Sequence, residues 1–161
     1  MPIRFVMKKH LPIIFSLVFF FISCNENRLY DSHVAPPGDL EWNRSDELSF
    51  DIEIIDTSIK YNQYISFRHA IGYAYSACSL KIIERAPDGA IVEYHTALPI
   101  ADTDGYKGDC HGDICDLEIC WLEKRTFNST GTYHYEISHE MTEDQIHMVM
   151  LVGMMLDKSV N

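Results

Sequence analysis

The sequence predicts an all-β fold: an antiparallel β-sandwich of about seven strands, either immunoglobulin-like or jelly-roll-like. Three observations lead to this prediction. Short stretches alternate between apolar and polar residues, turn residues separate them about every 8–14 residues, and no long stretch has the periodicity of a helix. Aromatic residues also make up 12% of the chain, with nine tyrosines, and this composition favours strands.

The segment 48–54 alternates most strictly, because leucine, phenylalanine and two isoleucines occupy every second position between serine and acidic residues. This is the pattern of a half-buried antiparallel strand. The remaining strands are expected at 64–68, 79–84, 91–98, 116–122, 133–137 and 147–156. Pro87-Asp88-Gly89 predicts the turn of a hairpin. Thr142 and Gln145 could instead cap a short helix before 147–156, although the valines and glycine there favour a strand.

Residues 1–23 have the three-part pattern of a bacterial lipoprotein signal peptide. Lys8 and Lys9 precede the apolar run 11–22, and Ser23 is the small residue before Cys24. Twelve helical residues span roughly 18 Å, which is short of the roughly 30 Å hydrocarbon core of a membrane. We therefore expect cleavage before Cys24 and lipidation of its sulfur. An uncleaved membrane span and a soluble secreted product are the alternatives.

Residues 24–43 are predicted to form a tether and residues 44–161 the β-sandwich domain. The tether contains Pro36-Pro37-Gly38, which interrupts regular structure. Trp42 is the first large apolar residue after it and is expected to dock on the edge of the domain, with ligand stacking as the alternative role.

The chain is strongly acidic, with a formal charge of −11. Removal of residues 1–23 takes away Arg4, Lys8 and Lys9 but no acidic residue, so the mature part is near −14. Such a surface repels the phosphates of nucleic acids and anionic lipid head groups. We therefore expect no nucleic-acid partner, and membrane attachment only through the lipid anchor.

Four cysteines follow Cys24, and an even number outside the cytoplasm suggests disulfides. Cys115 and Cys120 would lie roughly 16 Å apart on one strand, whereas a disulfide needs Cα atoms about 4.4–6.8 Å apart. We prefer Cys110–Cys115 across a turn together with Cys78–Cys120 between strands. Burial of all four as free thiols is the alternative. A zinc site is not expected, because the spacing is wide and the strand separates the cysteines onto two faces.

The sequence carries no recognisable catalytic motif. Gly-x-Ser-x-Gly is absent, and His139-Glu140 lacks the second histidine of His-Glu-x-x-His. Asp102-x-Asp104-Gly105 lacks the further acidic ligands of a calcium loop. His134, His139 and His147 are expected on strand surfaces. We therefore predict that the protein is not an enzyme and has no cofactor or metal.

A series of landmarks runs in order through the mature chain. They are the lipobox ending in Cys24, Asn27-Arg28-Leu29-Tyr30-Asp31, Trp42, Phe50, Phe67-Arg68, Tyr73-x-Tyr75, Pro87-Asp88-Gly89, Gly105-x-x-Gly108, Gly112-Asp113-Ile114, Gly131-x-Tyr133, His139-x-Met141 and Gly153. In this order and spacing the chain resembles the gliding-motility lipoprotein family of Bacteroidetes, the GldH type. Phe21 in the lipobox and the cysteines at 110, 115 and 120 depart from the family pattern.

The resemblance implies a lipid-anchored β-sandwich in the cell envelope of a Gram-negative bacterium, on the periplasmic side or in the outer membrane, with no catalytic residues. The only family residue that transfers is Cys24. We expect a non-enzymatic component of a gliding or related surface apparatus that binds other envelope proteins. The candidate partner-binding loop contains Asp102, Asp104, Asp109 and Asp113. The alternatives are a carbohydrate- or ligand-binding lipoprotein, with Trp42, Trp121 and tyrosines on an open face, and a small envelope hydrolase.

Overall fold

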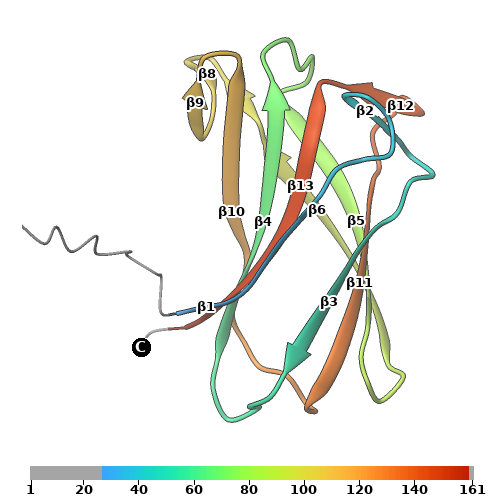
Figure 1. Ribbon diagram of the computed structural model, residues 1–161, viewed down its shortest axis with the longest axis vertical. Helices are drawn as coiled ribbons and strands as arrows, with labels where there is room; N and C mark the ends of the chain where they lie inside the picture. Colours follow the sequence, from blue (N-terminus) through green and yellow to red (C-terminus); the bar gives the residue numbers. More distant parts are fainter. Residues whose placement is uncertain (1–26, 160–161) are drawn as a thin grey trace, which may run out of the picture.

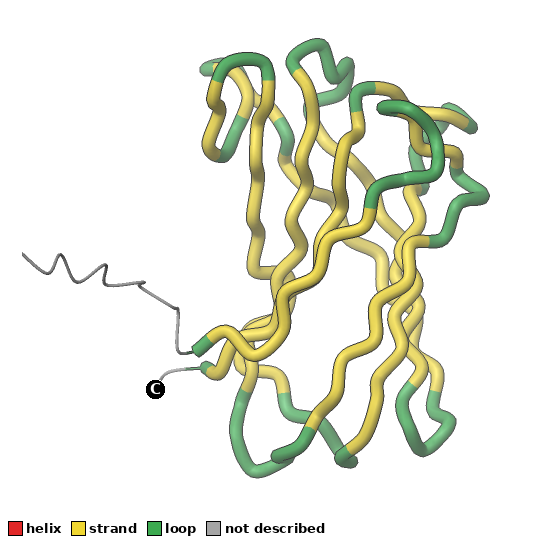
Figure 2. Tube along the Cα trace, viewed as in Figure 1, coloured by secondary structure: helices red, strands yellow, loops and turns green. Residues whose placement is uncertain are grey.

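The computed structural model describes residues 27–159 as two β-sheets packed face to face (Figures 1 and 2). One sheet has the order β1-β13-β4-β10-β9 and the other the order β3-β11-β5-β6. Their strands are β1 (Arg28–Val34), β3 (Leu48–Ile54), β4 (Tyr61–Ala70), β5 (Ala77–Arg85), β6 (Ile91–Pro99), β9 (Asp109–His111), β10 (Ile114–Arg125), β11 (Gly131–His139) and β13 (Val149–Lys158). Within 27–159 there is no helix, and therefore none that could cross a membrane.

Two short pairs complete the fold. They are β2 (Glu41–Asn43) with β12 (Gln145–His147), and β7 (Ala101–Asp102) with β8 (Gly105–Tyr106). The second pair lies where the sequence predicted a loop without strands. Both lie at the same end of the sandwich in Figure 1.

The pairing of the eight long strands identifies the sandwich as a jelly roll. The first long strand pairs with the eighth (β1 with β13), the second with the seventh (β3 with β11), the third with the sixth (β4 with β10) and the fourth with the fifth (β5 with β6), all antiparallel. A single long hairpin wrapped around itself produces this nesting. The nesting brings the two ends of the described chain together, where the Lys158 N–H donates to the Asn27 carbonyl at 2.8 Å.

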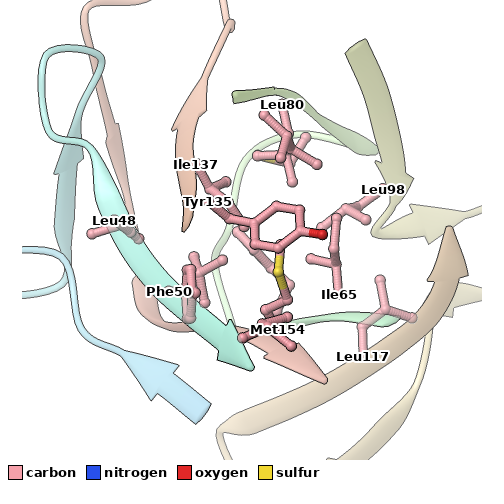
Figure 3. Close-up of a cluster of buried hydrophobic side chains, with 14 of the residues drawn as sticks. Leu48, Phe50, Ile65, Leu80, Leu98, Leu117, Tyr135, Ile137 and Met154 are labelled. Atoms are coloured by element: carbon pink, nitrogen blue, oxygen red, sulfur yellow. The ribbon is translucent and has the colours of Figure 1, made fainter. Parts of the chain in front are cut away.

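The core lies between the two sheets, where the inward faces of both meet. In β3 every second residue is buried, as the alternation predicts. Figure 3 shows side chains from both sheets converging on one apolar cluster. The labelled members are Leu48, Phe50, Ile65, Leu80, Leu98, Leu117, Tyr135, Ile137 and Met154.

All seven predicted strands are present, and the all-β sandwich is confirmed. The observed β3 has the predicted bounds of 48–54, and the other six overlap their predicted segments with ends that differ by a few residues. The segment 147–156 is strand rather than helix: the described chain has β12 up to His147 and β13 from Val149.

Two strands lie within the segment 24–43 that was predicted to be the tether. Residues 28–34 form β1, which is the edge strand next to β13, and residues 41–43 form β2. β1 was missed because its residues alternate only between half-buried and exposed, so the apolar periodicity is weak. The predicted signal peptide 1–23 and Cys24 lie outside the described residues.

Two aromatic residues are more buried than the sequence indicated. Trp42 is 0% exposed, so it belongs to the core instead of docking on the edge. Its indole N–H donates to the Asp46 carbonyl at 3.0 Å, and its ring meets His139 edge-on with centroids 5.2 Å apart. His139 is also buried, contrary to the expected surface position. The β2–β12 pair, which the sequence analysis missed, carries Trp42 into this position.

The strand register defines two ends of the sandwich. Tyr61, at the start of β4, pairs with Lys158 and Arg125, whereas Ala70, at its end, pairs with Ile114. Arg28 begins β1 opposite Asp157, which in turn pairs with Asn62, the residue after Tyr61. We call the end with Tyr61 and the chain termini the proximal end, and the opposite end the distal end. Ten residues of β4 separate them by about 30 Å.

Candidate functional site

Three connections at the distal end are hydrogen-bonded to one another. They are the β4–β5 loop (71–76), the β7–β8 hairpin and the β9–β10 hairpin. The Tyr106 hydroxyl accepts the Gly72 N–H and donates to the Tyr73 carbonyl, both at 3.0 Å. The Ile71 N–H donates to the Asp113 carbonyl at 2.8 Å. The three connections therefore form one defined surface.

All four predicted partner-binding carboxylates lie on this surface, which we call the acidic end. Asp102 and Asp104 come from the β7–β8 hairpin, Asp109 and Asp113 from the β9–β10 hairpin, and all four are exposed. The structure thus brings together residues that are up to eleven positions apart in the sequence. Figure 1 shows β8 and β9 at this end of the sandwich.

The carboxylates of the acidic end have few neutralising partners. Asp102 accepts the Asp104 N–H at 2.9 Å and pairs with the Lys107 ammonium at 3.2 Å. The Asp104 N–H, followed by Lys107, holds the pKa of Asp102 below its usual range. Asp109 lies 3.3 Å from His111. The described salt bridges include none to Asp104 or Asp113, so the acidic end keeps an outward negative field.

Two exposed isoleucines accompany these carboxylates. Ile71 is 50% exposed and Ile114 is 37% exposed, and they belong to loops joined by the Ile71–Asp113 hydrogen bond. Sequence analysis listed Ile114 only as part of a family landmark and did not name Ile71. The sequence does contain a signal for them. Ile71 directly precedes Gly72, Ile114 directly follows Gly112-Asp113, and a large apolar residue is unusual at such turn positions.

A disulfide joins Cys110 and Cys115, which are direct register partners on β9 and β10. It closes the hairpin that carries Asp113 and fixes Asp109 at its base. Gly108 precedes β9 with a φ of 88°, and a Cβ atom there would lie 2.2 Å from the Asp116 carbonyl oxygen. Only glycine therefore permits this close approach of the chain to β10.

Cys78 and Cys120 are not bonded to each other: both are free thiols in opposite sheets, on β5 and β10. Burial raises the pKa of Cys78 to about 11, and burial also raises the pKa of Cys120. A reactive cysteine needs a lowered pKa so that the thiolate is present at neutral pH. Neither thiol is therefore activated as a nucleophile.

A cleft of about 470 Å³ opens between β6 and the end of β10. Glu84 and Arg125 line it and form an ion pair whose side chains are only 5% and 13% exposed. Arg125 also donates to Gln63 at 2.8 Å and to the Tyr135 hydroxyl at 3.0 Å. The sequence analysis missed this pair, because the two residues are 41 positions apart and only strand packing joins them.

The groups of the cleft satisfy one another. The Tyr94 hydroxyl donates to Glu84 at 3.3 Å, and the Arg125 guanidinium lies 4.2 Å from the centroid of the Phe127 ring. Burial raises the pKa of Tyr94 and of Tyr135, so both hydroxyls stay protonated near neutral pH. None of these residues forms a nucleophile–base pair, so the arrangement is that of a structural network.

The open aromatic face required by a carbohydrate-binding site is not formed by the predicted tryptophans. Trp42 lies in the core, and Trp121 packs edge-on against Tyr94 with centroids 5.2 Å apart. Across residues 27–159, no group of three or more His, Cys, Asp or Glu side chains is arranged to hold a metal ion.

The fold and the surface define the class of domain: a jelly-roll sandwich with a disulfide-closed hairpin and an acidic surface at one end. The family follows from comparison. Residues 29–156 match the GldH lipoprotein family, and the chain belongs to it.

Two relatives show how far the sequence has diverged. The chain is 24% identical over 159 residues to a protein of Christiangramia forsetii named gliding motility lipoprotein GldH homolog, covering 92% of this chain and 94% of the relative. It is 22% identical over 136 residues to gliding motility lipoprotein GldH of Flavobacterium johnsoniae, covering 84% and 83%. The similarity therefore extends over nearly the whole of each protein.

Proposed function

We propose that the protein is a lipid-anchored, non-enzymatic component of a gliding or related surface apparatus, and that it binds another envelope protein through its acidic end. Membership of the GldH lipoprotein family and the names of both relatives support the role in motility. The pattern at 8–24 supports anchoring through Cys24.

The observation that carries the proposed binding role is the position of the four aspartates. They lie on a hydrogen-bonded loop surface at the distal end, about 30 Å from the end where the chain begins β1. A protein anchored through Cys24 would present this surface away from its attachment point. The carboxylates would steer a basic partner, and Ile71 and Ile114 would add apolar contact.

The test is replacement of Asp102, Asp104, Asp109 and Asp113 by Asn, followed by affinity capture of the tagged full-length lipoprotein from its native envelope. We expect a specific co-purifying protein to be lost while circular dichroism shows an unchanged fold. With the wild type, capture should weaken as salt rises, because the Debye length is only about 8 Å at physiological ionic strength.

A matched control changes the same amount of charge elsewhere. Replacing the exposed Glu47, Glu53, Glu93 and Glu123 by Gln removes four negative charges outside the acidic end. Retention of the partner by this variant supports a local site. Equal loss in both variants would contradict the acidic end as the contact, and turnover of a glycan, peptide or ester by the purified protein would contradict the non-enzymatic role.

The anchor has its own test. Cys24→Ala should abolish metabolic labelling with palmitate. Labelling equal to that of the wild type would refute Cys24 as the lipidation site.

A further inference from the structure

We infer that the proximal end of the sandwich rests on the membrane, with Ile55 and Leu29 in direct contact with lipid. This inference rests on the proposed anchor at Cys24. It adds a second, non-covalent membrane contact made by the folded domain, and it fixes which way the domain faces.

The first argument is the length of chain between the anchor and the fold. Because β1 begins at Arg28, only four residue steps separate it from Cys24, and they reach at most about 14 Å. Arg28 is held firmly: its guanidinium donates to Asp157 at 2.7 Å and to Glu118 at 2.8 Å. A bilayer-embedded Cys24 would therefore keep the proximal end within this distance of the lipid surface.

The second argument is the apolar surface found at that end. Ile55 is 77% exposed, which is the highest value among the exposed large hydrophobic residues of the described chain. Leu29 is 45% exposed and lies at an irregularity in the β1–β13 pairing. Both line a hollow of about 300 Å³ together with Tyr61 and Leu156. Two residues 26 positions apart thus form one apolar contact beside the chain terminus.

The loop that carries Ile55 has a defined shape. The Asp56 carboxylate accepts the Ser58 N–H at 2.8 Å and the Ser58 hydroxyl at 2.6 Å. The Tyr61 hydroxyl donates to the Asp56 carbonyl at 2.5 Å. These bonds hold the turn after β3, so the isoleucine before it is presented outward by a formed loop.

The charges at this end fit a lipid surface as the occupant. Exposed Lys60 and Lys158 flank the hollow, and long lysine side chains can lie along an interface with their ammonium groups in the head-group layer. The Asp56 carboxylate, next to Ile55, accepts the Ser58 hydrogen bonds and interacts with Lys158, and Asp51 and Glu53 line the hollow on β3. Contact is therefore mainly apolar and does not require anionic lipid.

The experiment uses the full-length acylated protein in phosphatidylethanolamine–phosphatidylcholine vesicles that contain doxyl-labelled phosphatidylcholine. An environment-sensitive fluorophore is attached through Ile55→Cys, with Cys120→Ser to remove the half-buried thiol. Cys78 is buried and Cys110 and Cys115 are bonded, so they do not compete for the label. Ile71→Cys is the matched control, because Ile71 is an exposed isoleucine at the distal end.

We expect a blue shift and strong quenching by the doxyl lipid at position 55, and neither at position 71. A label at Lys60→Cys should behave like position 55, and adding Ile55→Asp should reduce its quenching. Equal signals at 55 and 71 in protein that floats with the vesicles would overturn the inference while leaving the anchor intact. Failure of the wild type to float would overturn both the anchor and this inference.

Discussion

The cleft beside β6 and the acidic end both gather charged residues, but only one of them directs its charge outward. In the cleft, Arg125 and Glu84 are paired and nearly buried, and Gln63 and two tyrosines complete their hydrogen bonds. At the acidic end the aspartates are exposed on two hairpins, and Lys107 and His111 are their only described ionic partners.

The comparison explains why the cleft, although concave, is the weaker candidate for a binding surface. A cleft is the usual first candidate for a ligand site. Here the polar groups of the cleft already bind one another. A ligand that used them would have to break the partly desolvated ion pair between Arg125 and Glu84. The exposed carboxylates of the acidic end need no such displacement. The following three predictions test this difference, in order of expected effect.

The largest effect is expected from Arg125→Leu. Removing one partner leaves Glu84 buried without its counter-charge, so the free energy of unfolding should fall by about 3–5 kcal/mol. Urea unfolding of the detergent-solubilised full-length protein, followed by circular dichroism, measures the change. Arg125→Leu with Glu84→Leu should recover much of the loss, because no unpaired charge remains.

The control for this change is an exposed pair. Arg68 donates to Asp116 at 2.6 and 2.9 Å, but both side chains are more than 40% exposed. Arg68→Leu should therefore cost less than about 1 kcal/mol. Equal losses in the two variants would show that the Arg125–Glu84 pair is not the structural network described above.

A smaller effect is expected from removing the disulfide with Cys110→Ser and Cys115→Ser. The bond closes a short loop, so the expected loss in the free energy of unfolding is about 2 kcal/mol. The hairpin should also loosen locally: amide hydrogen exchange should quicken more in 109–116 than in β3, where it follows the global loss. Unchanged exchange in the hairpin would mean that the disulfide does not rigidify the acidic end.

The smallest effect concerns a second buried polar group, His139. Its Nε2–H donates to the Trp42 carbonyl at 3.1 Å, and its Nδ1 accepts the Met141 N–H at 3.4 Å. One ring nitrogen donates and the other accepts, so these hydrogen bonds match the neutral imidazole. Burial lowers the pKa of His139 below its usual value. The unfolded chain therefore binds this proton more readily, and stability should fall as pH drops below about 6.5, by at most about 1.4 kcal/mol per unit.

His139→Gln should remove this part of the pH dependence of unfolding, whereas His134→Gln should retain it. His134 is the suitable control because it is more exposed and pairs with Asp51 at 2.6 Å on the sheet surface. A pH profile that is identical for the wild type and His139→Gln would contradict the prediction.

The candidate site was only partly accessible from the sequence. The four aspartates were found because acidic residues cluster around turn glycines between 102 and 113. Ile71 was not connected with them, because its contact with Asp113 joins two loops that are 42 positions apart. The Cys110–Cys115 pair could be proposed from its spacing across a turn, whereas the free state of Cys78 and Cys120 depends on which sheet each strand joins.

The sequence by itself determined seven of the eight long strands and their inward faces, since side-chain alternation is a local property with a period of two residues. It also determined the lipobox pattern at Cys24, which is read from consecutive residues. Only the tertiary structure decided that β1 pairs with β13, that Trp42 is buried, and that Arg125 meets Glu84. These are contacts between residues that lie far apart in the chain. The wrapped hairpin of a jelly roll determines which strands become neighbours, so these residues meet only when the two sheets form and pack.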